Sequence, residues 1–366
     1  MSIEFSVLKR QYDLYAPEYE EAALRALRSG WYILGGELER FEKQFAEYMG
    51  VKHCIGINSG TDALILAVRA LGIGPGDEVI VPANTYIASV MGITENGATP
   101  VFVEPDAFFG LDAAKVEAAV TEKTKAILPV HLYGQACEMD KICAVAEKYG
   151  LAVIEDCAQS HGAKWNGRLT GTFGTIGCFS FYPTKPLGAL GDAGAMLTDD
   201  DALAEKLVML RNYGSRKKYV NEISGTNSRL DEVQAAVLGV GLKHLDDGNA
   251  YRAVIAEKYR SGITNPLVQL PEIREGQNHV WHVFALLCGQ RDALQQHLLD
   301  CGVKTLSHYP IPPHLQQCYA YLGHHAGEFP ISEKYAKCEL SLPIYVGMPM
   351  EEADAVISAV NSFRGA

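Results

Sequence analysis

No stretch of this sequence is apolar for long enough to cross a membrane, and acidic residues outnumber basic ones. The 366 residues include 32 Lys and Arg against 44 Asp and Glu, which gives a formal net charge of -12. A membrane span needs about 20 consecutive apolar residues, and domains that bind nucleic acid are usually basic. We therefore expect neither a membrane nor a nucleic acid as a partner, and any anionic ligand must be met by a local group of basic side chains.

The sequence also lacks a C-x-x-C pair, and its nine cysteines are odd in number. Such a set does not suit a disulfide framework and is typical of a reducing compartment. The N-terminal stretch has no long apolar core and no small-residue cleavage site, so we expect no signal peptide. These absences predict a cytoplasmic protein. His279 and His282 have no Cys or acidic partner at a suitable spacing, so we expect no metal site.

Short apolar segments alternate with helical segments from residue 51 onward. Strands are expected at 53–57, 78–82, 99–104, 125–131, 152–156, 178–182 and 194–198. Helices are expected at 62–71, 85–96, 112–120, 138–149, 200–211 and 230–245. The alternation predicts an α/β fold with a mainly parallel central sheet flanked by helices. Ligands of such sheets bind at the carboxyl ends of the strands.

The chain is longer than one compact core usually allows, so two domains are expected. Residues 1–245 would form a large domain, with an N-terminal helical segment at 1–50 that contains a helix at 16–29. Residues 246–366 would form a smaller C-terminal α+β domain, entered through a connecting helix. The expected elements of this part are the connecting helix at 241–262, strands at 280–288 and 302–306, and helices at 291–300 and 350–362.

Lys185 lies in the stretch Pro183-Thr184-Lys185-Pro186, directly after an apolar strand that carries Ser180. Each proline fixes its own φ and restricts the residue before it, so Lys185 is expected on a stiffened loop. A lysine desolvated in such a place has a lowered pKa, which makes its amine a nucleophile towards a carbonyl. The alternative is an ordinary loop lysine near the end of a strand.

The turn Asn58-Ser59-Gly60-Thr61 follows the first strand and opens a helix. Free N–H groups and the helix dipole at such a place bind phosphate well, and the Ser and Thr hydroxyls add donors. A simple helix cap has the same sequence pattern, so the turn alone leaves both interpretations open.

Asp156 ends another apolar strand and is followed closely by Gln159. The carboxylate could cap a helix, or it could keep a heteroaromatic nitrogen protonated. Tyr86 could stack on a flat ring or pack between helix and sheet. Together, an Asp, a Ser and a Lys in this chain order, after a phosphate-type turn, indicate a site for pyridoxal 5'-phosphate (PLP).

Five stretches extend this pattern along the chain: NSGTDAL (58–64), PANTYIAS (82–89), VIEDCAQSHGA (153–163), CFSFYPTKPLGALGDAGA (178–195) and TNSRLDEVQAA (226–236). On these motifs the sequence resembles the DegT/DnrJ/EryC1/StrS family of sugar aminotransferases over nearly its whole length. The resemblance implies the fold-type I architecture of PLP enzymes, L-glutamate as amino donor, and a homodimer with active sites at the subunit interface.

The resemblance also implies a role for each matched residue. Lys185 would form the Schiff base with PLP, and Asp156 would pair with the pyridinium nitrogen. Gln159 would hydrogen-bond the ring hydroxyl oxygen, and Tyr86 would stack on the ring. The phosphate would be held by Ser59, Gly60, Thr61 and Ser180, and by Asn227 of the neighbouring subunit. Pro186 replaces an asparagine often found after the lysine, which removes one donor but leaves the nucleophile.

Two further stretches, 211–219 and 308–314, resemble the branch of the family that aminates C-3 of a dTDP-3-keto-6-deoxyhexose. A basic run and two histidines there could neutralise the sugar diphosphate, since arginine suits phosphate through its fork of donors. A solvated basic loop and a structural histidine loop are the alternatives. The candidate substrate-binding residues are Tyr32, Tyr182, Arg211, Arg216, Lys217, Tyr219, His308, Tyr309 and His314.

Several rival functions stay open at this point. One is a 4-keto-sugar aminotransferase of the perosamine or bacillosamine type. Another is PLP-dependent sugar dehydration, but that branch lacks the lysine that this sequence has at 185. A third is a non-catalytic regulator on the same fold, which the joint retention of Asp156, Gln159, Ser180 and Lys185 disfavours. A nicotinamide dehydrogenase is disfavoured because no G-x-G-x-x-G turn follows the first strand.

Overall fold

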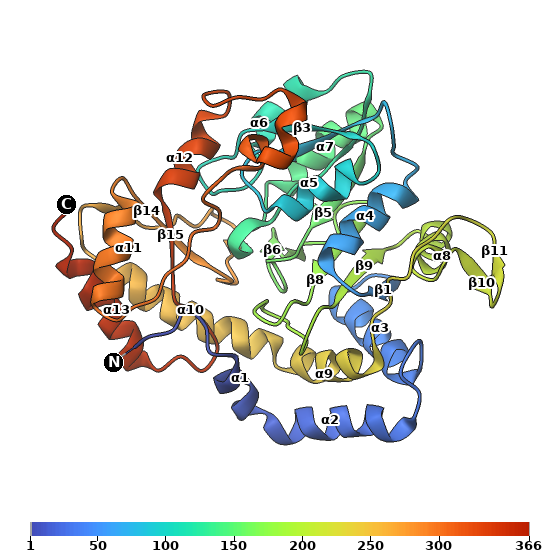
Figure 1. Ribbon diagram of the computed structural model, residues 1–366, viewed down its shortest axis with the longest axis horizontal. Coiled ribbons are helices and arrows are strands. Elements are labelled where there is room, and N and C mark those ends of the chain that lie inside the picture. The colour runs from blue at the N-terminus through green and yellow to red at the C-terminus, as the bar shows by residue number, and fades with distance from the viewer. Residues whose placement is uncertain (1, 366) are drawn as a thin grey trace.

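The computed structural model describes residues 2–365 and is built around a seven-stranded sheet (Figure 1). The strand order is β1-β9-β8-β5-β4-β2-β3. The strands are β1 His53–Ile57, β2 Glu78–Pro82, β3 Thr99–Val103, β4 Thr124–Ile127, β5 Ala152–Asp156, β8 Ile176–Ser180 and β9 Gly194–Thr198. Neighbours from β3 through β8 pair in parallel, whereas β9 runs antiparallel to both β8 and β1. The expected mainly parallel α/β sheet is therefore confirmed.

The antiparallel strand β9 has a simple cause. A parallel partner for β8 would need a crossover connection of about a dozen or more residues, usually through a helix. The segment between Ser180 and Gly194 contains no helix, so the chain returns as an antiparallel neighbour. This return loop carries Lys185 and holds it beside the ends of the parallel strands.

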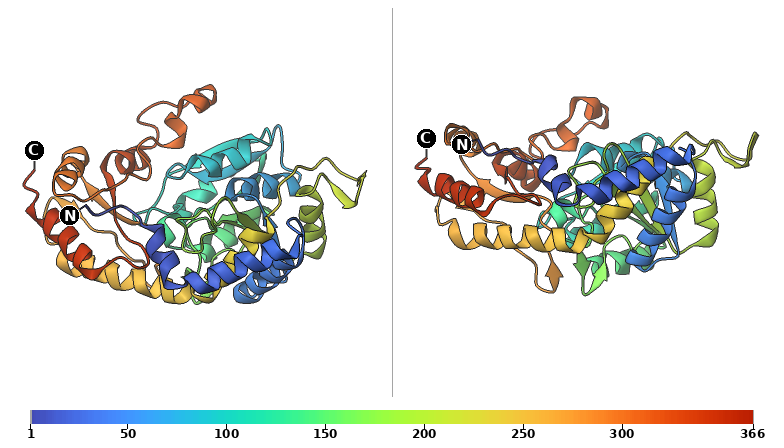
Figure 2. Two further views of the ribbon diagram at one scale, coloured as in Figure 1. Left: turned by 60° about the horizontal axis from the view of Figure 1, so that its bottom comes forward. Right: turned by 90° about the horizontal axis from the view of Figure 1, so that it is seen from below.

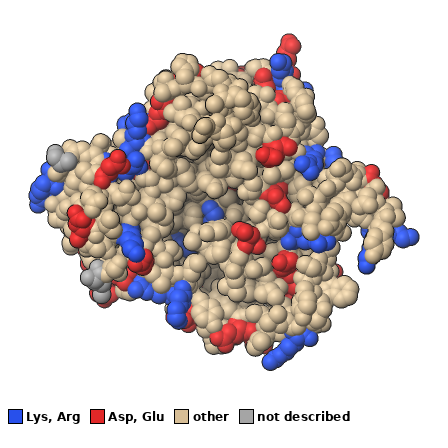
Figure 3. All heavy atoms as spheres, viewed as in Figure 1, with Lys and Arg blue, Asp and Glu red and all other residues tan. Residues whose placement is uncertain are grey.

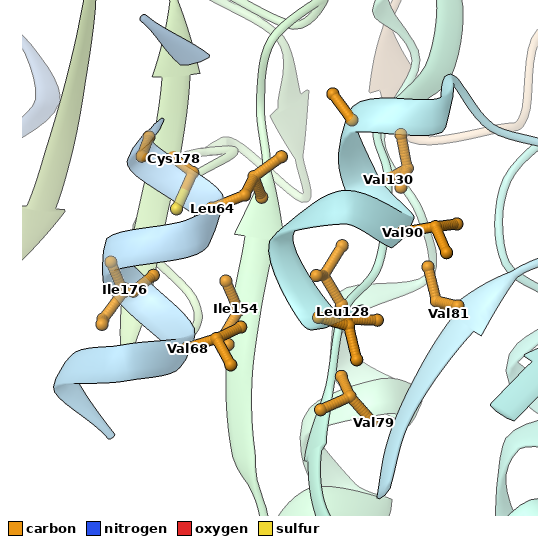
Figure 4. Packing of buried hydrophobic residues seen from close by; sticks show 14 of the residues in the cluster. Leu64, Val68, Val79, Val81, Val90, Leu128, Val130, Ile154, Ile176 and Cys178 are labelled. Carbon is orange, nitrogen blue, oxygen red and sulfur yellow. The ribbon is translucent and has the colours of Figure 1, made fainter. Parts of the chain in front are cut away.

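Helices cover both faces of the sheet. The helices α4 Gly60–Ala70, α5 Ile87–Thr94 and α8 Asp201–Leu210 pack on one face, where Leu64, Val68 and Val90 meet alternate residues of β2, β5 and β8 (Figure 4). In β2 the residues on either side of Ile80 belong to this cluster, but Ile80 packs on the other face with α7 Met139–Tyr149. This period of two follows from the alternating side chains of a strand.

The N-terminal helices pack on the first of two later consecutive helices, the second of which is the long connecting helix. They are α1 Leu8–Leu14, α2 Ala16–Ser29 and α3 Gly36–Met49, and the later pair is α9 Glu232–Lys243 and α10 Leu245–Gly262. Helix α2 has the predicted bounds, whereas α1 was not predicted. α2 packs on α9, and α10 runs from the large sheet to the C-terminal part (Figures 1 and 2).

The C-terminal part has its own three-stranded sheet, β12-β14-β15. Its elements are β12 Val268–Gln269, β14 Phe284–Cys288, α11 Arg291–Asp300, α12 Pro330–Cys338, β15 Glu339–Leu342 and α13 Met350–Ser362. The predicted strand at 302–306 is wrong. Only two isolated β-bridges form there: Val303 pairs with Ile3 on one side, and Leu306 pairs with Ser341 on the other.

Several smaller elements lie outside the large sheet. A hairpin, β10 Ser215–Lys217 with β11 Val220–Asn221, projects from the body (Figure 2). A second small sheet joins β6 Lys164–Trp165, β7 Arg168–Leu169 and β13 Gln277–Asn278. The short helices are α6 Ala113–Val116, η1 Glu117–Ala119, η2 Leu132–Gly134, η3 Pro313–Leu315 and η4 Gln317–Leu322. Within residues 2–365, every helix is too short or too polar to span a bilayer.

Candidate active site

A cavity of about 490 Å³ opens where β5 and β8 end and α4 begins. This is the edge of the sheet at which ligands of α/β folds bind. At this cavity the structure brings together most of the predicted cofactor-binding residues and some of the predicted substrate-binding residues. The predicted residues that line it are Ser59, Gly60, Thr61, Tyr86, Asp156, Gln159, Ser180, Tyr182, Lys185, His308 and Tyr309. Figure 3 shows the molecule hollowed near its middle, with Lys or Arg atoms inside the hollow.

Lys185 reaches the cavity from the loop between β8 and β9. Its backbone N–H donates to the carbonyl of Tyr182 at 2.8 Å, which closes a tight turn after the strand. Burial lowers the pKa of the Lys185 amine to about 8, although the negative charge of Asp156 opposes this shift. A lowered pKa leaves more of the amine unprotonated near neutrality, and the free amine is the nucleophilic form.

Asp156 ends β5 and is held from two sides. Ser89 donates its hydroxyl to Oδ2 at 2.7 Å, and the backbone N–H of Ala158 donates to Oδ1 at 3.1 Å. Thr85 shares a hydrogen bond of 2.7 Å with Ser89 and so fixes its hydroxyl. Burial raises the pKa of Asp156, while these bonds and the charge of Lys185 lower it. A cation placed against this carboxylate would compensate its buried charge.

Thr85 and Ser89 were not among the predicted site residues. Ser89 lies in the first turn of α5, and Thr85 lies two positions before that helix begins. Their hydroxyls were the only available signal, because the acceptor of Ser89 is Asp156, 67 positions away at the end of β5.

The first turn of α4 forms a cradle of backbone N–H groups. Ser59 caps the helix by accepting a bond from the N–H of Asp62 at 3.1 Å. A Cβ on Gly60 would lie 2.4 Å from the Cβ of Ser180, so only glycine allows the helix end to approach β8 this closely. Gly194 has the same restriction, since its Cβ would lie 2.5 Å from the carbonyl group of Ser59. The first N–H groups of a helix have no intrahelical acceptor, so this cradle fits a phosphate.

Aromatic rings and an amide form the opposite wall. The side chain of Gln159 accepts a bond from the N–H of Tyr133 at 2.6 Å and donates to the hydroxyl of Tyr309 at 3.1 Å. The rings of Tyr86 and Tyr309 lie 5.0 Å apart at 38°. Tyr86 is half exposed, so its ring face is free to meet a flat ligand.

The structure corrects the prediction for Arg211. Its side chain is buried, donates to Glu42 and donates to the carbonyl of Gly56 at 2.8 Å. The guanidinium therefore ties α3 to β1 and is not free to bind a sugar diphosphate. The sequence could not show this, because Glu42 lies 169 positions away.

His314 is also outside the cavity. It is buried beside the rings of Phe102 and Phe329, and its Nε2 lies 3.4 Å from Glu333. These contacts make it part of the packing between the 313–333 segment and β3. The structural alternative for this histidine therefore replaces its predicted role in substrate binding.

The remaining predicted residues do not reach the cavity of their own chain. Arg216 and Lys217 lie on the projecting hairpin, where Arg216 pairs with Glu205 at 3.2 Å. Tyr219, at the turn of this hairpin, is 88% exposed. Tyr32 and Asn227 are exposed at other points of the surface. In a single chain these residues therefore do not contribute to the cavity.

Replacing Arg211 by methionine tests the structural assignment. We expect a loss of about 3–5 kcal/mol in the free energy of unfolding, because the partly buried carboxylate of Glu42, 18% exposed, would lose its cation. The KM for the sugar substrate should stay within about twofold, a change of only ~0.4 kcal/mol. Denaturant unfolding and steady-state kinetics measure both. A large rise in KM at unchanged stability would restore the original prediction.

A buried cluster beside the cavity has metal-binding residue types but a structural arrangement. His131, Glu155 and Cys157 place one ligand atom each within 4.8 Å of one another. Glu155 already accepts from His131 at 3.0 Å and from the N–H groups of residues 171, 173 and 174 at 2.7 Å each. The N–H of Cys137 donates to the other ring nitrogen of His131 at 3.1 Å. These bonds anchor the 171–174 loop behind Asp156.

A cavity with a desolvated lysine, an oriented carboxylate and a phosphate cradle matches the predicted PLP site. The model of the DegT/DnrJ/EryC1/StrS aminotransferase family matches residues 15–361. The chain belongs to this family. It is therefore an aminotransferase, and PLP is its cofactor.

Individual members of the family cover almost the whole chain. A dTDP-3-amino-3,6-dideoxy-alpha-D-galactopyranose transaminase of Aneurinibacillus thermoaerophilus is 51% identical, over 95% of this chain and 96% of its own. A dTDP-3-amino-3,4,6-trideoxy-alpha-D-glucose transaminase of Streptomyces venezuelae is 48% identical, over 99% and 96%. The crystal structure of S. venezuelae DesV in complex with a ketimine intermediate gives a TM-score of 0.96 at 49% identity, over 98% of both chains.

Proposed function

We propose that this aminotransferase transfers the amino group of L-glutamate to C-3 of a dTDP-3-keto-6-deoxyhexose, giving a dTDP-3-amino-3,6-dideoxyhexose. The observation that carries the proposal is the pair of relatives near 50% identity, both named for 3-amino sugars linked to dTDP. The cavity supports it, because its lining matches the residues that the family motifs predicted. The proposal covers both the galacto and the gluco form of the product.

The residues of the cavity would bind the cofactor and transfer a proton. When bound, PLP supplies a carbonyl that takes up an amine and a ring that withdraws electrons. Lys185 would hold the cofactor through its amine and then move a proton between the substrate carbon and the cofactor. Asp156 would keep the ring nitrogen protonated, since its carboxylate is fixed and buried beside it. The α4 cradle with Ser180 would hold the phosphate.

The tyrosine wall and Gln159 would hold the ring of the cofactor. Tyr86 offers its exposed ring face, and Gln159 has a side-chain N–H beyond the one that it donates to Tyr309. These groups would orient the ring without changing its charge. Tyr182, half exposed at the cavity mouth, would contact the sugar.

The negative charge of the sugar diphosphate needs more cations than the described cavity lining of one chain supplies. Among the described residues lining the cavity, Lys185 is the only lysine or arginine. The projecting hairpin carries Arg216, Lys217 and Lys218 but lies away from this cavity. We therefore place the hairpin of one subunit at the cavity of its partner in a homodimer. Exposed aromatic residues such as Trp31 and Tyr213, 64% and 51% exposed, fit an interface on that side.

Mixed dimers test this arrangement. A chain with Lys185→Ala and a chain with Lys217→Glu and Lys218→Glu should each be poorly active alone. For the hairpin variant, we expect at least a roughly tenfold rise in KM for the sugar nucleotide, equivalent to about 1.4 kcal/mol. After subunit exchange, activity should return, because one cavity of the mixed dimer would combine an intact lysine with an intact hairpin.

The control for this experiment mixes Lys185→Ala with Asp156→Asn. Both changes lie in the same cavity of their own chain, so neither site of the mixed dimer would be intact. If this pair regained activity, or if the hairpin pair did not, the hairpin would not act across a dimer interface.

Three wider proposals concern the domains, the location and the product of the enzyme. We propose a large PLP-binding domain at 1–245, with the helical segment 1–50, and a small domain at 246–366. The apolar cluster of the C-terminal part supports this boundary, and Ile3 joins that cluster through its bridge to Val303.

We also place the enzyme in the cytoplasm, because all nine cysteines are free thiols. Its product would serve an O-antigen, an S-layer glycan or a glycosylated natural product.

Half-reactions test the proposed function before any product is isolated. Holoenzyme treated with L-glutamate should convert PLP to its aminated form, seen as a loss of visible absorbance. Adding a dTDP-3-keto-6-deoxyhexose of the preferred C-4 configuration should restore the absorbance. Restoration only by dTDP-4-keto-6-deoxyglucose would favour the 4-keto alternative. No change with glutamate would exclude glutamate as the donor.

A further inference from the structure

A chain of three hydrogen-bonding side chains leads from the interior of the C-terminal part to the cavity. Glu339 and Ser341 lie two positions apart on β15, so they share one face of the strand. The Ser341 hydroxyl shares one hydrogen bond with Oε1 of Glu339 and another, of 2.7 Å, with Nδ1 of His308. His308 lines the cavity. The chain therefore ends on an imidazole at the wall of the cavity.

Glu339 is fixed at the buried end of this chain. The carboxyl group accepts the backbone N–H of His308 at Oε2, 2.6 Å away, and its residue is 1% exposed. The charge of Arg291 acts on this carboxyl group, but Arg291 itself donates to the backbone carbonyl of Glu339 at 3.2 Å, and Asp292 pairs with its Nε. Tyr133 and Tyr309 also face this carboxyl group, and burial holds both phenols protonated by raising their pKa. No described residue forms a direct ion pair with the Glu339 side chain.

The imidazole of His308 is uncharged, so one of its two nitrogens carries the proton. Burial and the nearby charge of Lys185 lower the pKa of His308 to about 4. His282 also lies at the cavity, and its pKa is lowered in the same way, so it adds no charge near neutrality. With Nδ1 occupied by Ser341, Nε2 is the nitrogen left to meet a ligand. Whether Nε2 donates or accepts depends on the direction of the hydrogen bonds behind it.

The direction of these bonds depends on whether Glu339 carries a proton. A protonated Glu339 donates to Ser341, Ser341 then donates to Nδ1, and the imidazole proton stays on Nε2. An ionised Glu339 accepts from Ser341, which then accepts from Nδ1–H, and Nε2 is left with a lone pair. One state presents a donor to the cavity and the other an acceptor.

We propose that Glu339 is a positioning residue that acts through Ser341 to keep the proton of His308 on Nε2, so that the histidine donates a hydrogen bond to an oxygen of the bound keto sugar. The contact with the sugar rests on the proposed function, whereas the position of the proton does not. The exchange between the two states releases one proton to solvent. Nε2 loses its proton, Ser341 passes its own to Nδ1, and Glu339 passes its own to Ser341.

Burial sets the pH at which the two states exchange. It raises the pKa of Glu339 to about 8, although Ser341, the N–H of His308 and Arg291 oppose the shift. Glu339 is therefore protonated below this pKa and ionised above it. The donor on Nε2 is present near neutrality and is lost as the pH rises through about 8.

NMR of 15N-histidine-labelled, otherwise deuterated holoenzyme locates the proton directly, with His308→Asn to assign the signals. We expect wild-type His308 to be protonated on Nε2 at about pH 6.5 and on Nδ1 at about pH 9.5, on either side of the Glu339 pKa. Glu339→Gln should stay in the Nε2 form at both pH values, because the amide donates to Ser341 at any pH. Glu257→Gln, an exposed matched control, should behave as wild type.

The substrate contact has its own measurement. In wild type, the KM for the keto sugar should rise about fivefold between these pH values, because one neutral hydrogen bond to the sugar is lost. In Glu339→Gln this fivefold rise in KM should be absent. If wild-type His308 keeps one tautomer at both pH values, or if Glu339→Gln still switches, the relay is wrong. If the tautomer switches as expected and no keto sugar is aminated, the relay stands and the proposed function fails.

Discussion

Replacing Lys185 by alanine is expected to abolish turnover, with a loss of about 10⁴-fold or more. The amine is the only lysine or arginine group among the described residues that line the cavity, and burial lowers its pKa to about 8. The variant would lose both the covalent anchor of the cofactor and the base that moves the proton. Steady-state transamination with glutamate measures the loss, and the visible spectrum shows whether PLP remains covalently attached.

Two further variants make the Lys185 experiment specific. Lys185→Arg keeps the positive charge but not the nucleophilic amine, so it should be as inactive as the alanine variant. Lys43→Ala, on the exposed face of α3, should keep wild-type turnover. Wild-type activity in Lys185→Ala would refute the assigned chemistry of the cavity.

Replacing Asp156 by asparagine is expected to slow the glutamate half-reaction while leaving the fold intact. The amide is isosteric, so its oxygen can still accept from the N–H of Ala158 while its NH2 group donates to the hydroxyl of Ser89. It lacks the charge that would keep the ring nitrogen protonated. Removing one partner of a buried charge pair costs about 2–5 kcal/mol, which corresponds to a roughly 30- to 5,000-fold slower reaction.

Stopped-flow absorbance after mixing with glutamate measures this rate. Asp354→Asn, which changes an exposed carboxylate on α13, is the matched control and should react like wild type. A wild-type rate in Asp156→Asn would mean that the ring nitrogen does not depend on this carboxylate.

Much of the fold and cavity was predictable because the decisive signals are local. A short apolar strand followed by polar residues marks the carboxyl end of a parallel strand, and the parallel topology gathers such ends at one edge. Asp156 and Lys185 meet for this reason, because Asp156 ends β5 and Lys185 lies on the loop that follows β8. The sequence signal at Gly60 was equally local, because a glycine at the start of a helix marks a close approach. The missing Cβ lets α4 approach Ser180.

The corrections share the opposite cause. The partner of Arg211 is Glu42 and that of Ser89 is Asp156, and neither pairing leaves a periodic trace in the sequence. The segment 302–306 has the residue types of a strand, but its two neighbours each pair with only one residue of it. Such outcomes depend on long-range packing, which local propensity does not encode.

The position of the new amine tests the proposed C-3 transfer most directly. Holoenzyme would be incubated with 15N-labelled L-glutamate and, in turn, dTDP-3-keto-6-deoxy sugars of both C-4 configurations and dTDP-4-keto-6-deoxyglucose. NMR of each product then identifies the carbon that carries the 15N label. We expect the label on C-3 of one of the 3-keto sugars, and none on the 4-keto sugar. A label on C-4 would contradict the proposed regiochemistry, and no labelled sugar from any of the three would contradict the proposed substrate class.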